Sequence, residues 1–104
     1  MPTPNLNAKM DRSLLILTAL ASGPKHGYAL MQDIADFSGI RIGPGTLYNS
    51  LSKLEARGLI QALDPDDRRR PYRITPKGIA ELRDQLSESA RLAQFGLRRL
   101  RASR

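Results

Sequence analysis

Cysteine and histidine, which build metal and redox sites, are missing or scarce in this chain. The 104 residues include no cysteine and one histidine, and there is no tryptophan. Without cysteine there can be no disulfide and no thiolate ligand, and one histidine leaves too few nitrogen ligands for a metal centre. The lack of cysteine also fits a reducing compartment. We therefore expect a cytoplasmic protein with no metal and no cofactor.

Long apolar segments are missing as well. The longest apolar run covers residues 14–17, whereas a membrane-spanning helix needs about 20 such residues. Residues 1–9 lack the apolar centre of a signal peptide. The sequence also shows no nucleophile next to a base and no paired carboxylates with an orienting partner. These absences predict a protein that is not an enzyme and has no membrane partner.

Positive charge is abundant. Lysine and arginine total 17 against 10 acidic residues, which gives a formal net charge of +7. A chain of this length forms one domain with a modest core. So basic a domain is attracted to polyanions, either nucleic acid or an acidic membrane surface. The alternative is that the charge serves only to keep the protein dispersed.

Apolar periodicity and helix-end residues predict four helices. The first, at about residues 9–21, is apolar on almost every side and should be buried on most sides, in part by a second subunit. The second runs over about 27–37. The third covers 44–57, with a proline at its first position, where the missing N–H does no harm. The fourth begins at Pro76.

Two short strands are predicted between the third and fourth helices. They cover residues 59–63 and 72–75, and turn residues fill 64–67. Three helices followed by a hairpin make a winged helix-turn-helix, with the third helix as the recognition helix. We therefore expect a mainly α fold with a small β-hairpin. Residues 9–75 form the DNA-binding domain, and 76–104 form a long C-terminal dimerisation helix.

The last helix carries an apolar stripe that continues for its whole length. At more than 20 residues it extends on the order of 35 Å, which is more than a three-helix domain can cover. We expect the stripe to pack on another copy of the chain; the alternative is that the helix folds back on its own domain. The stripe follows helical spacing and consists of Leu82, Leu86, Ala90, Ala93, Leu97 and Leu100.

The third helix has a polar face suited to DNA. Its leucines at 47, 51 and 54 should face the core, and the opposite face lacks the Glu and Lys pattern of a merely solvated helix. Asparagine can bond adenine through two atoms, hydroxyls can bond phosphates or bases, and lysine can bond phosphate or guanine. The helix N-terminus at Gly43–Gly45 also favours phosphate. The predicted contacts on this face are Thr46, Asn49, Ser52 and Lys53.

Further candidates flank that face. Tyr48 can either bond a phosphate or pack against the wing. The wing arginines Arg68, Arg69 and Arg70 can enter a minor groove or contact phosphates, or they can form a solvated turn, and the neighbouring aspartates at 66 and 67 could pair with them. His26 is expected either to order the start of the second helix or to contact phosphate.

Several motifs resemble the PadR family of bacterial transcriptional regulators. They are the Gly-Pro-x-His-Gly-Tyr block at 23–28, Pro-Gly-Thr-Leu-Tyr at 44–48 and "YRITPKG" ending at residue 78. The resemblance implies a winged-helix repressor that forms a homodimer through its first and last helices. It also implies that Thr46, Tyr48 and the wing contact double-stranded DNA.

One residue and one segment depart from the family pattern. Gly43 stands where the family usually has serine, which removes a possible phosphate contact, and the segment "DPDDRRR" is similar to the wing of the MarR family. Some small PadR-type dimers bind flat aromatic compounds between subunits. With only five aromatic residues, this chain gives no sign of such an effector site. The alternative function is a winged-helix dimer whose basic face binds an acidic protein.

Overall fold

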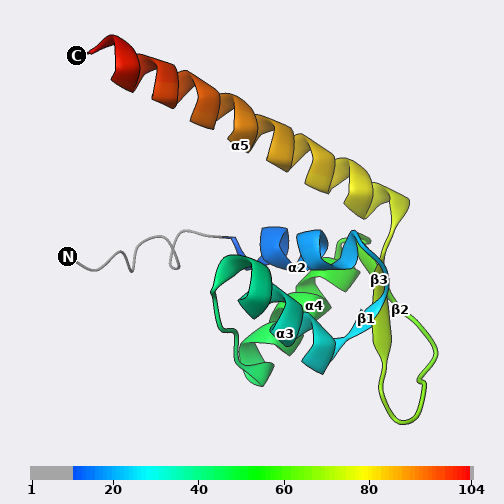
Figure 1. The fold of residues 1–104 in the computed structure, drawn as a ribbon. Coiled ribbons are helices and arrows are strands. Elements are labelled where there is room, and N and C mark those ends of the chain that lie inside the picture. Colours follow the sequence, from blue (N-terminus) through cyan, green and yellow to red (C-terminus); the bar gives the residue numbers. More distant parts are fainter. Residues whose placement is uncertain (1–10, 104) are drawn as a thin grey trace.

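The computed structural model describes residues 11–103 (Figure 1). The first predicted helix was expected from residue 9, so its first two positions lie outside the described residues, as does position 104 of the last helix. Within the described part the four predicted helices and the two predicted strands are confirmed in their order, and one further short strand is present. The elements are α2 (Arg12–Leu20), β1 (Lys25–His26), α3 (Gly27–Ser38), α4 (Pro44–Ala56), β2 (Ile60–Ala62), β3 (Pro71–Ile74) and α5 (Pro76–Ala102).

Local capping explains where the helices begin and end. Asp11 starts α2 by accepting a hydrogen bond from the Ser13 amide at 2.9 Å. Thr75 does the same for α5, accepting from the Gly78 amide at 3.0 Å, with a proline at the first helical position. Gly39 ends α3 in the left-handed conformation, at φ 75°.

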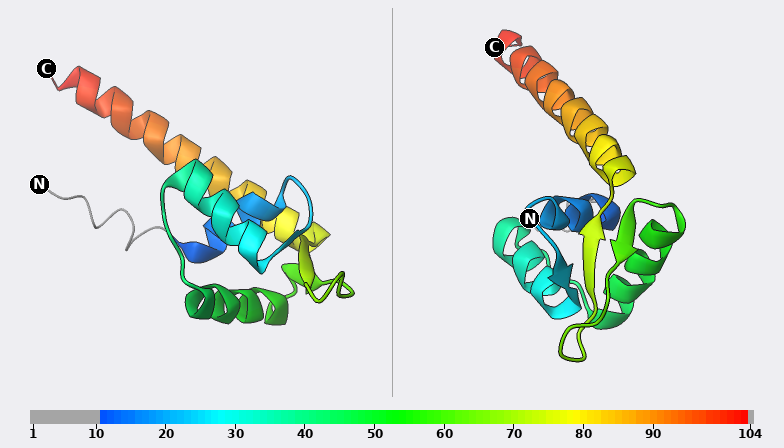
Figure 2. Two further views of the ribbon diagram at one scale, coloured as in Figure 1. Left: turned by 60° about the horizontal axis from the view of Figure 1, so that its bottom comes forward. Right: turned by 90° about the vertical axis from the view of Figure 1, so that its right-hand side faces the viewer.

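The sheet has three strands where the sequence predicted two. β2 and β3 form the expected antiparallel pair, with Ile60 opposite Ile74, and the two-residue strand β1 adds to the other edge of β3, with Lys25 opposite Tyr72. In Figure 2 the strands lie between α3 and α4. β1 therefore ties the start of α3 to the wing, a link that was not predicted from the sequence.

The core is entirely aliphatic. Each of the three helices α2, α3 and α4 contributes leucine or isoleucine, and the start of β2 closes one end. No polar or charged side chain is buried among residues 11–103, so the core holds no candidate catalytic group. The side chains that are essentially inaccessible are Ile16, Leu17, Leu20, Leu30, Ile34, Leu47, Leu51, Leu54, Leu59 and Ile60.

The long helix α5 leaves the domain after two turns. Leu82 is buried against the core, but Leu86, Leu97 and Leu100 are 43 %, 56 % and 67 % exposed. Figure 1 shows α5 extending past α2 with its C-terminal half clear of the other elements. The helix therefore does not fold back on its own domain over this length. None of the helices in the described part is long and apolar enough to cross a membrane.

Candidate nucleic-acid interface

The polar face of α4 is open to solvent. Leu47, Leu51 and Leu54 are fully buried, as their spacing predicted. That burial fixes the rotation of the helix, because side chains three and four positions apart share one face. The four predicted contacts on the opposite face are all exposed, namely Thr46, Asn49, Ser52 and Lys53.

The start of α4 leaves backbone donors available. Its N-cap, Gly43, makes no side-chain hydrogen bond to the first turn. The amides of Gly45 and Thr46 lie in that first turn, where helix geometry provides no carbonyl partner. A methyl group built on Gly43 or Gly45 meets nothing within 4 Å, so a large anion can approach closely. The helix dipole adds positive potential at the same place.

Tyr48 lies against the start of α3. A methyl group added at Gly27 would overlap the phenol oxygen of Tyr48, so the glycine makes room for the ring. The ring is nevertheless 48 % exposed. It shares a shallow hollow with His26, Tyr28 and the three wing arginines. The structure thus brings Tyr48 and the wing together, while its role at DNA stays a prediction. Gly27 lies in the motif at 23–28, but its role in making room for this ring was not predicted.

His26 holds the start of α3, one of its two predicted roles. The Ala29 amide donates to Nδ1 at 3.4 Å, and Nε2 lies 3.3 Å from a guanidinium nitrogen of Arg69. A neutral imidazole has only one acceptor nitrogen. When Nδ1 accepts from Ala29, the Arg69 contact is not a hydrogen bond, and that guanidinium is only weakly held.

The wing ends in a tight two-residue turn. Asp66 and Arg69 exchange backbone hydrogen bonds, and the residues between them, Asp67 and Arg68, have φ values of 52° and 68°. This is the conformation of a type I′ hairpin turn, which usually contains Asn-Gly or Gly-Gly. A left-handed arginine costs about 1–2 kcal/mol. The first tip residue, Asp67, is the last of the predicted turn residues, and the second, Arg68, lies one position beyond them.

The wing arginines differ in how they are held. Arg70 donates to the Leu63 carbonyl at 3.4 Å, and Arg73 donates two bonds to Gln61 across the sheet. Among the described residues, no hydrogen bond or ion pair involves the guanidinium of Arg68. The ion pairs in that part are Lys25–Asp33 and Arg57–Glu81. The expected pairing of arginines with the carboxylate of Asp66 or Asp67 is therefore wrong. Asp66 contacts Arg69 through backbone hydrogen bonds instead.

Tyr72 is half-buried and packs against the core from β3. Burial raises the pKa of its phenol, the negative charge of Glu55 and nearby Tyr48 raise it further, and Arg70 partly offsets these effects. The phenol is therefore neutral near neutral pH and remains a hydrogen-bond donor.

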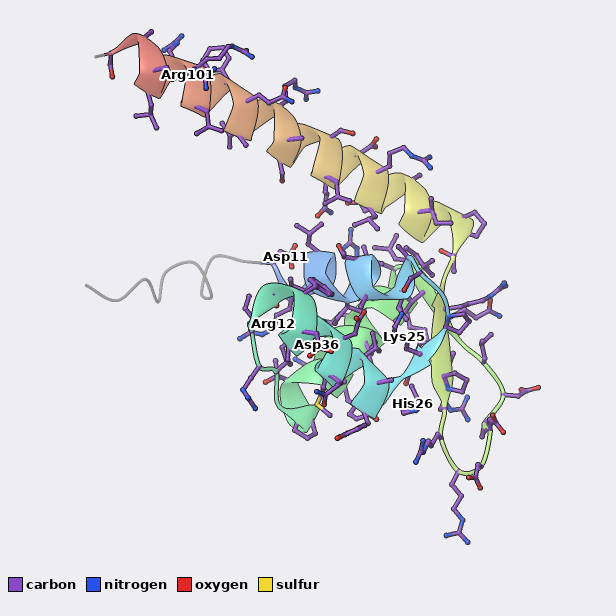
Figure 3. All side chains as sticks on the ribbon, in the orientation of Figure 1. Asp11, Arg12, Lys25, His26, Asp36 and Arg101 are labelled. Carbon is purple, nitrogen blue, oxygen red and sulfur yellow. The ribbon has the colours of Figure 1, made fainter. Side chains whose placement is uncertain are left out.

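The polar face of α4 and the wing form one surface, on the side of the domain away from α5. The left view of Figure 2 shows α4 and the wing together at the bottom and α5 leaving at the top. Figure 3 shows His26 pointing toward the wing, and Arg101 far away near the end of α5. No group of His, Asp and Glu side chains in residues 11–103 could hold a metal ion. The surface suits a polyanion rather than catalysis.

Replacing His26 separates its two contacts. His26→Ala removes the cap of α3 and should lower the free energy of unfolding by about 0.5–1 kcal/mol, because the capping bond is long. His26→Asn keeps a capping acceptor but cannot reach Arg69, and should recover most of that loss. Urea unfolding followed by circular dichroism measures both. Equal losses in the two variants would mean that the contact with the wing, and not the cap, is the stabilising one.

Comparison with known proteins identifies relatives of this chain. The profile described as "Transcriptional regulator PadR-like family" matches residues 16–84. The chain is 43 % identical over 84 residues to the transcriptional regulator Rv3488 of Mycobacterium tuberculosis, covering 75 % of this chain and 78 % of that protein.

A second relative is much longer. An uncharacterised 37.1 kDa protein in transposon TN4556 of Streptomyces fradiae is 45 % identical over 83 residues, which is 80 % of this chain. The chain spans about a quarter of the length of that protein, 24 %. Among solved structures, a PadR family transcription regulator from Clostridium difficile R20291 superposes with a TM-score of 0.73 at 22 % identity, covering 80 % of this chain and 91 % of that one.

Proposed function

We propose, because this chain belongs to the PadR-like family of transcriptional regulators, that it binds double-stranded DNA sequence-specifically as a dimeric repressor. The observation that carries the proposal is the composition of one surface. The exposed face of α4 presents an amide, hydroxyls and a lysine, and the three wing arginines lie beside it. Duplex recognition uses uncharged polar side chains that bond base edges and cationic side chains that contact the phosphates.

The proposed contacts divide by chemistry. Asn49 reads a base edge in the major groove, and Ser52 and Lys53 contact bases or phosphates beside it. Thr46 and the free amides of the first turn of α4 hold a phosphate. Tyr48 donates its phenol to the backbone, and Arg68, Arg69 and Arg70 contact phosphates or the adjacent minor groove.

Each part of the chain has one task. Residues 9–75 form the winged helix that binds DNA, and residues 76–104 form the helix that joins two copies. The first and last helices both take part in the dimer. With chromosomal DNA as the partner, we also propose a cytoplasmic location. No effector is part of the proposal.

Duplex binding tests the proposal directly. We expect the protein to bind fragments from upstream of its own gene at least 10³-fold more tightly than random duplex of equal length at physiological salt. Fluorescence anisotropy measures both affinities, and footprinting locates the protected site. Equal affinity for the two DNAs would contradict sequence-specific regulation.

Asn49 is the residue expected to read sequence. Asn49→Ala should cost about 1–3 kcal/mol on the specific site and leave binding to random duplex nearly unchanged, because a base contact is lost. Lys53→Ala is the matched control on the same face: if it contacts phosphate, it weakens binding to both DNAs. Equal losses for Asn49→Ala on the two DNAs would remove this residue from base readout.

Arg68 should show opposite effects on stability and on binding. Glycine adopts the left-handed conformation without strain, so Arg68→Gly should raise the free energy of unfolding by roughly 0.5–1 kcal/mol. The same change should weaken binding to all duplexes and reduce the salt slope by about one unit, as for a lost phosphate contact. Thermal unfolding and salt titrations measure the two effects. Unchanged DNA affinity would show that the arginine is only part of a solvated turn.

The second candidate function is binding of an acidic protein by the same basic surface. The net charge of +7 favours it as much as it favours DNA. It predicts that an acidic peptide competes with random duplex, and that no DNA sequence is preferred. The comparison of upstream and random DNA therefore separates the two functions.

A further inference from the structure

The basic residues of this chain are unevenly distributed. Residues 11–90 carry 11 basic and 10 acidic side chains, so their charges nearly cancel. Residues 91–103 carry four arginines and no acidic side chain. The excess positive charge of the described part therefore lies mainly at the far end of α5. It does not lie on the wing, where the arginines are accompanied by Asp64, Asp66 and Asp67.

Three of these four arginines share one face of α5 with two apolar side chains. At helical spacing this face covers about 120° of the helix and is centred on Phe95, opposite the apolar stripe. Leu82 of the stripe is buried in the core, so the opposite face points away from the domain. We call it the outer face of α5. It consists of Arg91, Leu92, Phe95, Arg98 and Arg99, all of which are exposed.

The guanidinium groups of the outer face have free hydrogen-bond donors. Within residues 11–103 none of them makes a hydrogen bond or an ion pair, and the two ion pairs found there involve Lys25 and Arg57. The guanidinium carbons of Arg99 and Arg98 lie 4.5 Å and 5.9 Å from the ring centre of Phe95. Such cation–π contacts restrict the two side chains without using their N–H groups. The donors therefore remain available to an anion.

The helix dipole does not explain this cluster. Cations stabilise a helix only near its last turn, where the basic residues are Arg99 and Arg101. Arg91 lies about three turns before the end of α5, beyond the reach of that effect. A surface that serves only solubility usually mixes both signs of charge. A face with cations alone suits a polyanion instead.

We propose that the outer face of α5 binds the phosphate backbone of a second DNA duplex, so that the protein joins two duplex segments. This goes beyond the proposed function, which assigns DNA to α4 and the wing alone. Arginine binds phosphate through two N–H groups at once. The outer face has no amide or hydroxyl side chain that could bond a base edge, so this second contact is independent of sequence.

The positions of the two surfaces require a second duplex. α4 and the wing lie on one side of the domain, and α5 leaves from the other side (Figure 2). Because the domain lies between them, a straight duplex on α4 does not reach the outer face. Once α4 holds one segment, other segments of the same DNA are present at a high effective concentration.

An acidic protein fits the outer face less well than DNA does. The centre of a protein–protein interface usually holds an apolar or aromatic anchor that is fully desolvated. Here the side chain at the centre is Phe95, and the charged guanidinium of Arg99 lies over its ring. A phosphate backbone needs the guanidiniums and no apolar anchor.

Capture of a second duplex tests the proposal. The fragment from upstream of the gene is immobilised, loaded with fewer protein molecules than binding sites and washed, and a fluorescent random duplex is then added. We expect the loaded fragment to retain the random duplex at about 50 mM salt and to release most of it at about 200 mM, because phosphate contacts weaken with salt. The bare fragment should retain none.

Two double variants locate the second site. Arg98→Gln/Arg99→Gln should weaken retention about tenfold or more and lower its salt slope by about two units, as for two lost phosphate contacts. Arg83→Gln/Arg101→Gln is the matched control, because it removes the same charge from the same helix at positions about 120° from the centre of the outer face. It should retain the random duplex like the unsubstituted protein.

Both double variants should fold and bind a single duplex as before. Glutamine and arginine have similar helix propensities, and all four positions are exposed. Circular dichroism and sedimentation check the fold and the oligomeric state. Anisotropy on the upstream fragment alone should give an unchanged affinity for both variants.

Loss of retention in Arg98→Gln/Arg99→Gln alone, with unchanged affinity for the upstream fragment, supports the second site. Equal loss in the two double variants shows that only net charge matters and overturns it. No retention by the unsubstituted protein, or retention that survives in Arg98→Gln/Arg99→Gln, also overturns it. Displacement of the second duplex by poly-L-glutamate at equal charge concentration shows that the face takes acidic polypeptides as well, and overturns the assignment to DNA.

The proposed function and the second site fail separately. If the upstream fragment binds no better than random duplex, sequence-specific regulation is contradicted. The same comparison of the two double variants on an immobilised random duplex then still decides whether the outer face of α5 holds a second duplex.

Discussion

Leu86→Glu should convert the protein to monomers and lower its affinity for a two-half-site operator by about 10²–10⁴-fold. In the proposed dimer the substitution places an uncompensated carboxylate in the interface formed by α5, which costs several kcal/mol. A monomer presents one recognition helix, and the second contact is no longer intramolecular. Sedimentation and anisotropy measure the two effects, and the helical content of the monomer should persist in circular dichroism.

Phe95→Glu is the control for that experiment. It adds the same charge to the same helix at an apolar side chain that is 48 % exposed, but on the side away from the stripe. We expect it to remain a dimer and to bind DNA as before. A Leu86→Glu protein that is still dimeric and binds its operator normally would show that the dimer forms elsewhere.

Gly78→Ala should lower the free energy of unfolding by about 2 kcal/mol or more, the upper part of the range for overpacking. A methyl group at this position would overlap the Leu59 carbonyl oxygen and lie 2.8 Å from a side-chain carbon of Ile74. The carbonyl cannot easily move, because it accepts the Thr75 amide at 3.0 Å. For a domain of this size, thermal unfolding should shift downward by roughly 10 °C.

Gly45→Ala is the matched control for stability. Gly45 also lies in the first turn of a helix that begins with proline, but a methyl group there meets nothing within 4 Å. Alanine has a higher helix propensity, so stability should stay the same or rise by up to about 1 kcal/mol. Equal destabilisation of the two variants would mean that helix starts in general, and not the contact with Leu59, explain the loss.

The regular parts of this fold could be predicted because their signals are local. The leucines at 47, 51 and 54 repeat at helical spacing, and their burial fixes which side of α4 faces outward. The order of helices and strands follows from residues that begin and end them, such as Gly39 and Thr75. Those same signals indicated the polar face of the candidate site.

The parts that were missed depend on contacts between distant residues. Strand β1 is two residues long and exists because it pairs with β3, whose residues lie more than 40 positions away. Gly27 is required by the ring of Tyr48, and the Arg69 contact of His26 is just as remote. The tip extends one residue past the predicted turn, to Arg68, because Asp67 and Arg68 adopt a turn that usually needs glycine.

Hydrogen bonds hold the start of α5 to the turn that follows α4. Thr75 donates to the Gly58 carbonyl at 2.7 Å and accepts from the Gly78 amide, and Lys77 donates to the Arg57 carbonyl. A helix of 27 residues is about 40 Å long, so a tilt of about 5° at its base moves its far end by roughly 3.5 Å. That displacement equals about one base-pair step along a DNA strand, 3.4 Å. In the proposed dimer, these three hydrogen bonds therefore set how strictly the protein measures the spacing between operator half-sites, and loosening them should let it accept half-sites one base pair nearer or farther apart.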